Sequence, residues 1–245
     1  MTYYRYETHC HTSPVSNCAR ATVKETVQFY KEAGYDGIFL SNHFLDGNMN
    51  PKAKTLPYEE QIEYYFSDYE AAVIEGKKIG LKVFPGVELS YRGTDFLVYG
   101  LEKEWYKAHA EIMKMEKTEE LKMMMEAGAL VVQAHPYRED YYIDHIRLYP
   151  RCVHAVEIVN SHQPDLANHM AVVYAEAYGL KKTCGSDSHT ADQVFNVLEK
   201  KGLRKEIAGM CSSVPLTCAE DYVRMVKADE MKPFVYTAEG QWRLL

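Results

Sequence analysis

The stretch TYYRYETHCHT (residues 2–12) begins with aromatic and β-branched residues and then places two histidines one residue apart. That composition is typical of a β-strand. Side chains alternate along a strand, so His9 and His11 should lie on one face and point the same way at the strand's carboxyl end. Two imidazoles in this arrangement can bind a transition-metal ion, because neutral histidine is a common ligand for such ions.

Strand-like and helix-like segments alternate along the rest of the chain. Further strands are predicted over residues 37–43, 82–91, 95–101, 129–136, 155–161 and 181–190. Amphipathic helices are predicted over 21–34, 58–80 and 165–180, and a Met-rich helical stretch ends near Ala127. Capping boxes are predicted for Thr22 with Glu25 and for Thr217 with Glu220. In the helix over 165–180, apolar residues in helical register (Leu166, Met170, Val173 and Ala177) predict the inward face.

This alternation predicts an α/β fold with a largely parallel sheet. About seven strand–helix units can be recognised, close to the eight of a closed (β/α) barrel, so we expect a barrel-like arrangement. An open doubly wound sheet is the alternative, although the nucleotide fingerprint GxGxxG is absent from the sequence. There is no low-complexity linker, so we expect a single catalytic domain spanning residues 1–245.

Composition narrows the class of protein. The net charge of −7 argues against a long nucleic acid as partner, since phosphate contacts need clustered Lys and Arg, but leaves room for a small phosphorylated substrate. The six cysteines form no CxxC pair, and the N-terminal residues do not resemble a signal peptide. No stretch approaches the roughly 18 apolar residues of a membrane span. We therefore expect a cytoplasmic protein with free thiols and no membrane association, of undetermined oligomeric state.

Metal-ligating residue types gather at the ends of the predicted strands. They are His9, His11, His43, Glu88, His135, Asp187 and His189, with Asp95 at the start of its strand. Carboxyl-terminal strand ends form the active-site face of an α/β barrel, and Asp95 reaches that face only if its strand runs antiparallel. Imidazole and carboxylate suit Mn, Fe or Zn. There are more ligands than one ion needs, so we expect two or three divalent ions sharing Glu88.

Other polar residues are weaker candidates for the same site. Arg20 and Arg138 are predicted to bind substrate phosphate, because guanidinium matches phosphate geometry. His162 follows a strand end and could reach the site. Glu157 and Asn160 end the strand before it. Cys10 alternates with the two histidines and should point into the core.

The order of the motifs HxH, SNH, GVEL, AHP and GSDSH resembles that of the PHP superfamily, named for polymerase and histidinol phosphatase. The resemblance extends from Thr8 to about Val226. It implies a distorted (β/α)7 barrel, a centre of two or three metal ions and phosphoesterase activity. It also implies site roles: His9, His11, Glu88 and Asp187 would be the catalytic residues and hold one ion, Glu88 and His135 a second, and His43 and His189 a third.

The chain departs from the family pattern at several positions. Ser16 and Asn17 stand where the family often has Asp or His, so the third ion site should be weak or empty. Asp95 stands where the family often has His, which would favour Mn or Fe over Zn. Asn42 replaces the usual Asp before His43, so this histidine should lack that carboxylate partner.

The residues and the resemblance together predict metal-dependent hydrolysis of a phosphate ester, by a phosphatase or phosphodiesterase similar to histidinol phosphatase. One alternative is an amidohydrolase-type C–N hydrolase, whose barrels also begin with HxH but usually need a ligand lysine or two later strand-end histidines. Another is a PHP module that binds metal without catalysis, which the intact HxH and DxH pairs argue against. Histidinol phosphate, a nucleotide, a sugar phosphate and a short oligonucleotide all remain open as substrates.

Overall fold

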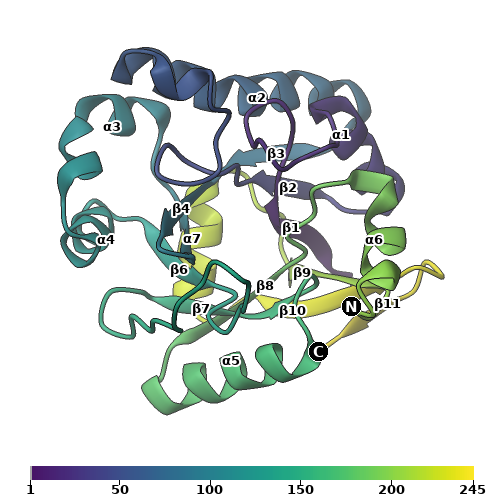
Figure 1. Cartoon of the computed structure of the whole chain (residues 1–245). Coiled ribbons are helices and arrows are strands. Elements are labelled where there is room, and N and C mark those ends of the chain that lie inside the picture. Colours follow the sequence, from purple (N-terminus) through teal and green to yellow (C-terminus); the bar gives the residue numbers. More distant parts are fainter. Residues whose placement is uncertain (1) are drawn as a thin grey trace.

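The computed structural model describes residues 2–245, so Met1 of the expected domain lies outside this range. Helices surround two mixed sheets (Figure 1). The first sheet has the order β11-β10-β9-β1-β2-β3. Its strands are β1 (Tyr4–Cys10), β2 (Gly37–Leu40), β3 (Lys82–Pro85), β9 (Glu206–Ser212), β10 (Lys232–Thr237) and β11 (Trp242–Leu244). β1, β2 and β3 are parallel, whereas β9 pairs antiparallel with β1.

The second sheet has the order β4-β5-β6-β7-β8. Its strands are β4 (Val87–Tyr91), β5 (Thr94–Tyr99), β6 (Leu130–Ala134), β7 (Ala155–Asn160) and β8 (Lys181–Gly185). β5 runs antiparallel to both of its neighbours, while β6, β7 and β8 are parallel. This reversal places the first residues of β5 beside the last residues of β6, so Asp95 reaches the face that the carboxyl ends of the other strands form.

The α/β class is confirmed, but a closed (β/α)7 barrel is not. Between residues 2 and 245 the strands form two separate sheets rather than one continuous ring. Isolated bridges join the sheets where strands end: Cys10 pairs with Ser188, and His43 pairs with Glu88. The two sheets therefore come together at the carboxyl ends of β1, β2 and β8, where the candidate ligands lie.

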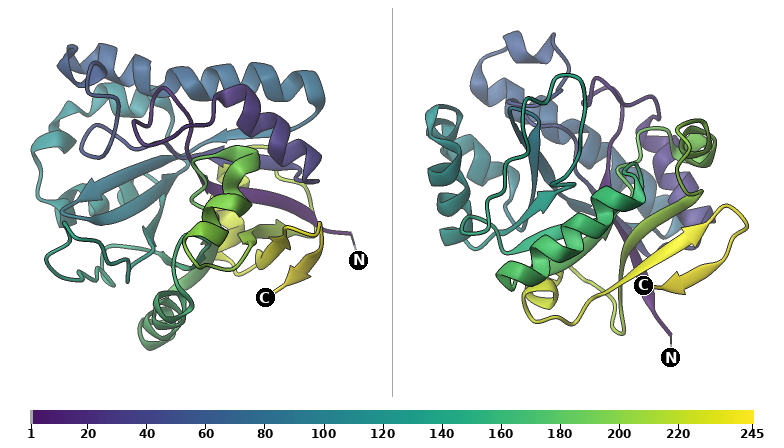
Figure 2. Two further views of the ribbon diagram at one scale, coloured as in Figure 1. Left: turned by 45° about the vertical axis from the view of Figure 1, so that its right-hand side comes forward. Right: turned by 60° about the horizontal axis from the view of Figure 1, so that its bottom comes forward.

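Helices cover the outside of the sheets. They are α1 (Val23–Glu32), α2 (Tyr58–Ile79), α3 (Lys103–Ala108), α4 (Lys117–Glu126), α5 (Asp165–Tyr178), α6 (Val194–Lys200) and α7 (Ala219–Lys227), with short 3₁₀ turns at Ala53–Thr55, Ala110–Lys114 and Ala191–Gln193. The Met-rich stretch is thus divided between α3, a 3₁₀ turn and α4. Figure 2 shows α5 lying along the outer surface and the two chain ends close together.

The predicted helix caps have different outcomes. Thr22 and Glu25 form the expected capping box at the start of α1. The second prediction is wrong, because Thr217 bonds the carboxylate of Asp221 rather than that of Glu220. Thr217 lies before the N-cap residue Cys218, so its hydroxyl and backbone N–H meet the carboxylate four residues along the chain.

The main core takes side chains from both sheets and from α7. Tyr6 and Phe39 of the first sheet, Val132 of the second and Tyr222 of α7 are all fully buried in it. This cluster fixes the two sheets relative to each other, and it lies beneath the strand ends that carry the polar residues. No helix among the described residues is long and apolar enough to cross a membrane.

The inward face predicted for α5 is wrong. Leu166 is 72% exposed and Val173 is 44% exposed, whereas Ala171, Tyr174 and Ala175 are buried. The helix is apolar on both sides, and the side with small alanines packs on the sheet. Burial of Tyr174 is compensated by a 3.0 Å hydrogen bond between its hydroxyl and Gln133 Oε1.

Candidate metal centre

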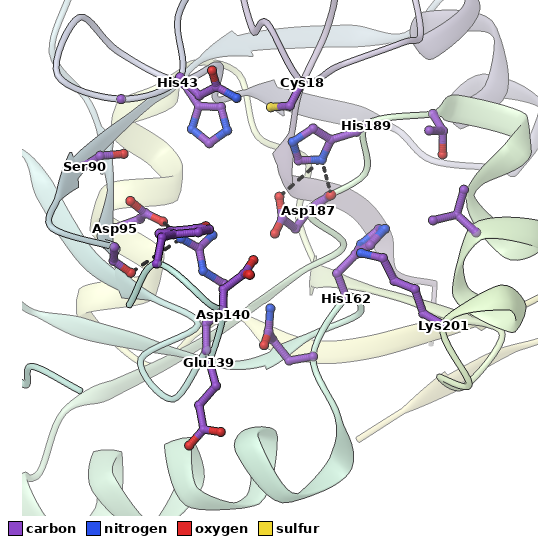
Figure 3. A pocket seen from close by; sticks show the side chains of 18 of the residues that line it. Cys18, His43, Ser90, Asp95, Glu139, Asp140, His162, Asp187, His189 and Lys201 are labelled. Carbon is purple, nitrogen blue, oxygen red and sulfur yellow. Dashed lines mark hydrogen bonds and ion pairs between the residues drawn. The ribbon is translucent and has the colours of Figure 1, made fainter. Parts of the chain in front are cut away.

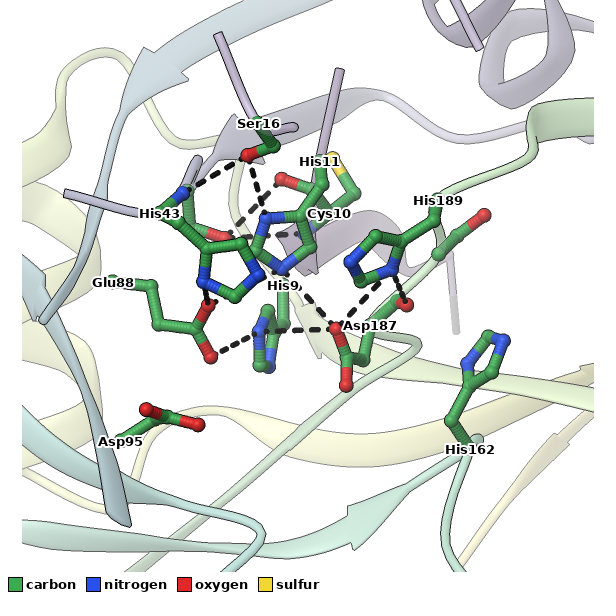
Figure 4. A network of polar contacts seen from close by, with 12 residues as sticks. His9, Cys10, His11, Ser16, His43, Glu88, Asp95, His162, Asp187 and His189 are labelled. Atoms are coloured by element: carbon green, nitrogen blue, oxygen red, sulfur yellow. Dashed lines mark hydrogen bonds and ion pairs between the residues drawn. The ribbon is translucent and has the colours of Figure 1, made fainter. Parts of the chain in front are cut away.

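Strand ends from both sheets bring the predicted ligands into one cluster. The cluster, which we call the metal centre, comprises His9, His11, His43, Glu88, Asp95, His135, Asp187 and His189. All of these residues except His189 are buried. Figure 4 shows the imidazoles of His9, His11, His43 and His189 directed toward the carboxylates of Glu88 and Asp187. Every residue predicted from the sequence as a metal ligand therefore lies in this one region.

Glu88 occupies the middle of the metal centre. Its Oε1 atom lies 3.1 Å from His9 Nε2 and 3.4 Å from His135 Nε2. Its Oε2 atom lies 2.6 Å from His43 Nδ1 and 3.4 Å from His11 Nε2. Each carboxylate oxygen thus faces a different pair of imidazoles, which is the arrangement required of a carboxylate that bridges two ions.

Asp187 approaches the same imidazoles from the opposite side. Its Oδ1 atom lies 3.2 Å from His11 Nε2 and 3.5 Å from His9 Nε2. Asp187 and His135 both follow strand ends, and their φ angles are 56° and 25°. Positive φ is uncommon for residues other than glycine, and such strain concentrates at functional sites. The backbone therefore supports an orientation of these two side chains that regular strand geometry would not give.

Asp95 and Arg138 form an ion pair at the edge of the metal centre. Arg138 Nη2 lies 3.0 Å from Asp95 Oδ2, and the same oxygen lies 3.8 Å from His135 Nε2. Glu88, Asp95 and His135 can each offer an atom within 4.8 Å of the others. Asp95 is thus placed where a ligand would be, while Arg138, predicted to contact phosphate, has a carboxylate partner.

The donor atoms of the metal centre fit a divalent cation. Several are fully buried and contact one another without hydrogen-bond geometry: His9 Nε2, His11 Nε2, His43 Nδ1, His135 Nε2 and both oxygens of Glu88. Unsatisfied buried polar atoms are costly, so a cluster of them indicates groups that bind something further. Ligand atoms of three residues approach within 4.8 Å in the sets His9–His11–Glu88, Glu88–Asp95–His135 and His11–His43–His189. Imidazole nitrogens with carboxylate oxygens suit Zn, Fe or Mn.

Hydrogen bonds to the second ring nitrogen orient three of the histidines. His9 Nδ1 lies 2.9 Å from Glu157 Oε1, and His189 Nδ1 lies 2.8 Å from the Asp187 carbonyl oxygen. His11 Nδ1 lies 3.2 Å from Ser16 Oγ. When Nδ1–H donates these bonds, Nε2 carries the lone pair that can bind an ion.

Glu157, only a weaker candidate for the site from the sequence, contacts ligand residues from two strands. One of its oxygens faces His9 Nδ1, and the other accepts hydrogen bonds from the His135 backbone N–H at 3.1 Å and Asn160 Nδ2 at 2.9 Å. Its place at a predicted strand end was the available signal. The sequence could not show whether it would contact an ion or a ligand histidine.

Close packing also fixes His9. A Cβ atom added to Gly185 would lie 2.5 Å from His9 Cβ and 2.7 Å from Glu157 Oε1. Glu7 Oε1 accepts hydrogen bonds from the backbone N–H groups of Thr8, His9 and Ser186. Because of these contacts, the strand end that carries His9 has little freedom to move.

The positions where the chain departs from the family pattern have structural roles. Ser16 Oγ is fully engaged, because it contacts His11 Nδ1, donates to Asn42 Oδ1 at 2.8 Å and accepts from the His43 backbone N–H at 3.0 Å. Asn42 also accepts a bond from the Thr12 backbone N–H at 2.7 Å. Asn17 is exposed. Asn42 and Ser16 thus orient the loop after β1.

The close packing of carboxylates and imidazoles shifts the pKa values of both kinds of group. Burial opposes ionisation of Glu88, but the imidazoles of His43, His9 and His11 hold the pKa of its carboxyl well below the ordinary value. His9 and His11 do the same for the pKa of Asp187, again against the effect of burial. Burial and the nearby His189 and His43 lower the pKa of His11 well below the ordinary value. These two carboxylates are therefore charged and His11 is neutral. Burial also lowers the pKa of His9 and His43, but the neighbouring carboxylates outweigh it and raise both well above the ordinary value, so an ion that binds these two rings would displace their protons.

An open cavity of about 930 Å³ lies over the metal centre. His43, Asp95, Asp187 and His189 reach it from the metal centre, and Cys18, Arg20, Arg92, Arg138, His162 and Lys201 lie on its walls (Figure 3). Arg20 is exposed, as expected of a residue available to substrate. His162 Nδ1 lies 2.8 Å from the Ser186 carbonyl oxygen, so His162 reaches the cavity rather than the central cluster.

Cys18 was not predicted to be near the metal centre. Figure 3 shows its sulfur between the rings of His43 and His189. Partial removal from water raises the pKa of the Cys18 thiol, but hydrogen bonding with His189 and His43 outweighs this effect and lowers it to about 6. No periodic pattern predicts the position of Cys18, because it lies in the irregular loop between β1 and α1.

Comparison with known proteins gives matches in structure only. No protein-family profile and no curated protein sequence matches the chain. A two-domain protein from Bacteroides vulgatus containing a predicted PHP-like metal-dependent phosphoesterase is similar, with a TM-score of 0.66 and 15% identity. The match covers 95% of this chain, which spans 64% of that protein's length.

Two further solved structures are similar over most of their length. A proposed metal-dependent phosphoesterase from Bifidobacterium adolescentis has a TM-score of 0.52 and 13% identity, with 76% of this chain and 88% of that chain covered. An amidohydrolase from Chromobacterium violaceum has a TM-score of 0.54 and 13% identity, with 92% and 96% covered. At such low identity these matches establish fold, and the chain has the fold of the PHP-like metal-dependent phosphoesterases.

Proposed function

We propose that the chain is a hydrolase that cleaves a phosphate ester with the help of two or three divalent metal ions. The observation that carries this proposal is the convergence of buried imidazoles on the carboxylate of Glu88 beneath an open cavity. A structural core seldom gathers so many ionisable side chains, because burying them costs more free energy than apolar packing does. We further propose that residues 1–245 form one catalytic domain of distorted-barrel type.

The ligand assignment follows the distances within the metal centre. His9, His11, Glu88 and Asp187 would hold one ion, and Glu88, Asp95 and His135 would hold a second. His43 and His189 would contribute to a third. Bound Mn, Fe or Zn would supply Lewis-acid stabilisation of the phosphoryl oxygens and would make water more acidic.

The protein's own side chains would position the substrate. Arg20 lines the cavity above the centre, where its guanidinium can donate two hydrogen bonds to a phosphate group. Arg138 lies deeper and is paired with Asp95, so its charge mainly balances that carboxylate. The cavity admits a small phosphorylated molecule. His162 has a pKa lowered by burial to about 4, so at neutral pH it is uncharged and can offer a ring nitrogen for hydrogen bonding at the cavity wall.

The test combines metal analysis with activity. The purified chain, loaded separately with Mn, Fe or Zn, would be assayed for phosphate release from para-nitrophenyl phosphate and a panel of phosphorylated metabolites. His9→Ala and Glu88→Ala should abolish release, whereas His169→Ala, on the exposed side of α5, should retain it.

Each of the other outcomes would indicate a different function for the chain. Hydrolysis of amides but not phosphate esters would indicate a C–N hydrolase. More than one bound ion per chain without turnover of either class would indicate a non-catalytic metal-binding module. Less than one bound ion per chain after reconstitution would contradict the metal centre itself.

A further inference from the structure

We propose that the thiolate of Cys18 is a ligand of the third ion, together with His43 and His189. The proposal deepens the proposed function, on which it rests, and concerns which ion this site prefers. It also revises the expectation from the sequence that the third site lacks a ligand because Ser16 and Asn17 stand in the loop.

The loop after β1 holds Cys18 at the cavity wall. The backbone N–H of Asn17 donates to the Asn48 carbonyl oxygen at 2.9 Å, and the N–H of Arg20 donates to the His189 carbonyl oxygen at 2.8 Å. Residues on both sides of Cys18 are thus fixed, one of them directly to the segment that carries His189. Figure 3 shows the sulfur between the rings of His43 and His189, and all three side chains line the same cavity.

Independent of the cysteine, the neighbouring histidines indicate a ligand at this point. Ring nitrogens of His11, His43 and His189 lie within 4.8 Å of one another. The ring of His11 stacks on those of His43 and His189, with centroids 4.4 Å and 4.2 Å apart. His43 Nδ1 lies 2.6 Å from Glu88 Oε2, and His189 Nδ1 lies 2.8 Å from the Asp187 carbonyl oxygen, so the Nε2 atom of each ring remains for a third ion. Three stacked imidazoles beside a buried carboxylate are better explained by a shared cation than by core packing.

The number of ligands supports the same conclusion. His11 Nε2 also lies beside Glu88 and Asp187, so it is available to the first ion. His43 and His189 alone would give the third ion two protein ligands, whereas catalytic zinc sites use three and keep one open position. Ser16 Oγ is occupied by hydrogen bonds and cannot supply the third. Cys18 can.

The chemistry of sulfur predicts a selective site. Thiolate is a softer ligand than carboxylate and favours Zn over Mn, so the third site should differ from the two that include Glu88. Binding would exchange the S–H proton, released to solvent, for a metal–sulfur bond, with no change of oxidation state. The centre would then combine a thiolate-containing site with two carboxylate-containing sites.

The first measurement is spectroscopic. The chain would be loaded with Co²⁺ as a probe, and its near-ultraviolet spectrum would be recorded for wild type, Cys18→Ser and Cys218→Ser. Cys218 is the matched control, because it is also an exposed free cysteine but lies against a separate cavity. Wild type and Cys218→Ser should show thiolate-to-cobalt charge transfer, and Cys18→Ser should not.

The second measurement needs no spectrum. Alkylation of each cysteine by iodoacetamide would be mapped by mass spectrometry with and without Zn²⁺. Zinc should slow alkylation of Cys18 and leave that of Cys218 unchanged. In a competition with a chelator, Cys18→Ser should bind the weakest ion more than about tenfold less tightly, since even outer-shell changes cost about 10–100-fold.

The outcomes separate this inference from the proposed function. Three ions bound to the wild type without charge transfer, and without protection of Cys18, would overturn the ligand role while leaving a functional metal centre. Failure of the wild type to bind any ion would overturn both. Loss of charge transfer in Cys18→Ser, together with continued binding of two ions, would establish the proposed site.

Discussion

At the scale of single residues, Glu157 determines which nitrogen of His9 faces the metal centre. It also receives the backbone N–H of His135, so one carboxylate orients ligands from two strands. Outer residues of this kind are conserved partners of metal ligands in general, because they fix the ring and raise its basicity.

Glu157→Gln should therefore weaken metal binding by about 10–100-fold without removing any ligand. The amide keeps the shape of the side chain, but its NH₂ group would face a backbone donor that now bonds a carboxylate oxygen. Competitive chelator titration measures the change, with Glu176→Gln, on the exposed surface of α5, as the control. Unchanged affinity would show that His9 needs no carboxylate partner.

Gly185→Ala tests the close packing beneath His9. The added methyl group would lie 2.5 Å from His9 Cβ, so the strand end must move. We expect a loss of about 1–3 kcal/mol in the free energy of unfolding, together with weaker metal binding. Gly179→Ala is the control, because nothing lies within 4 Å of a Cβ at that position and only its positive φ of 65° is strained. It should lower stability without altering metal affinity.

The sequence predicted the ligands better than the residues that support them. His9, His11 and Asp187 could be predicted because strand ends in a parallel sheet converge, whatever the details of the loops. Cys18 could not, since its position depends on a loop conformation that no periodic pattern encodes. The role of Ser16 also could not be foreseen, because a hydroxyl can serve either a ring nitrogen or an ion.

At the scale of elements, the direction of β5 decides whether Asp95 can reach the metal centre. The turn between β4 and β5 makes β5 antiparallel, and only this direction brings Asp95 to the metal centre. The sequence predicted this condition for Asp95, that its strand must run antiparallel. It failed for α5, where the apolar stripe faces outward, because a helix that is apolar on two sides gives no unique inward direction.

His154 joins three neighbouring strands and makes stability depend on pH. Its Nδ1 atom accepts the Val131 backbone N–H of β6 at 3.2 Å, and its carbonyl oxygen accepts the Lys181 N–H of β8 at 3.0 Å. Burial, with a smaller effect from Lys227, lowers the pKa of His154 from 6.5 to about 4. The unfolded chain therefore binds a proton more readily than the folded one between these values, so stability falls as pH decreases from 6.5 toward 4.

His154→Asn should remove this contribution, because its amide oxygen can accept from Val131 but does not titrate. The wild type should lose roughly 2 kcal/mol more than the variant between pH 7 and pH 4, at about 1.4 kcal/mol per pKa unit and with some reduction for solvent exposure. Urea unfolding at several pH values measures the difference. The same pH dependence in both proteins would assign the effect elsewhere, and His169→Asn should match the wild type.

At the scale of the whole molecule, metal and fold stabilise each other. Ions that bind only the folded chain add about 2.7 kcal/mol when their concentration is 100 times the Kd. Chelation should therefore lower the melting temperature of the wild type and have little effect on Glu88→Ala, which lacks the central carboxylate. Calorimetry with and without chelator would test this, and equal shifts in both proteins would argue against a role for Glu88 in binding.

The α/β class could be predicted from the alternation of strands and helices, but the division into two sheets could not. Whether a ring closes depends on strand tilt and on pairings between distant segments, such as β1 with β9. Those pairings are set by packing in three dimensions, and a linear pattern carries no information about them.

The position of β1 inside its sheet has a consequence for protein synthesis. Its partner β9 lies about two hundred residues later in the chain, and Tyr6 also accepts a hydrogen bond from the Leu216 backbone N–H. During synthesis on the ribosome, the edge of β1 that pairs with β9 stays unpaired until β9 has emerged. It needs shielding from other nascent chains until then. Asp187 also lies far from His9 along the chain, so the metal centre cannot assemble until the segment after β8 has been synthesised.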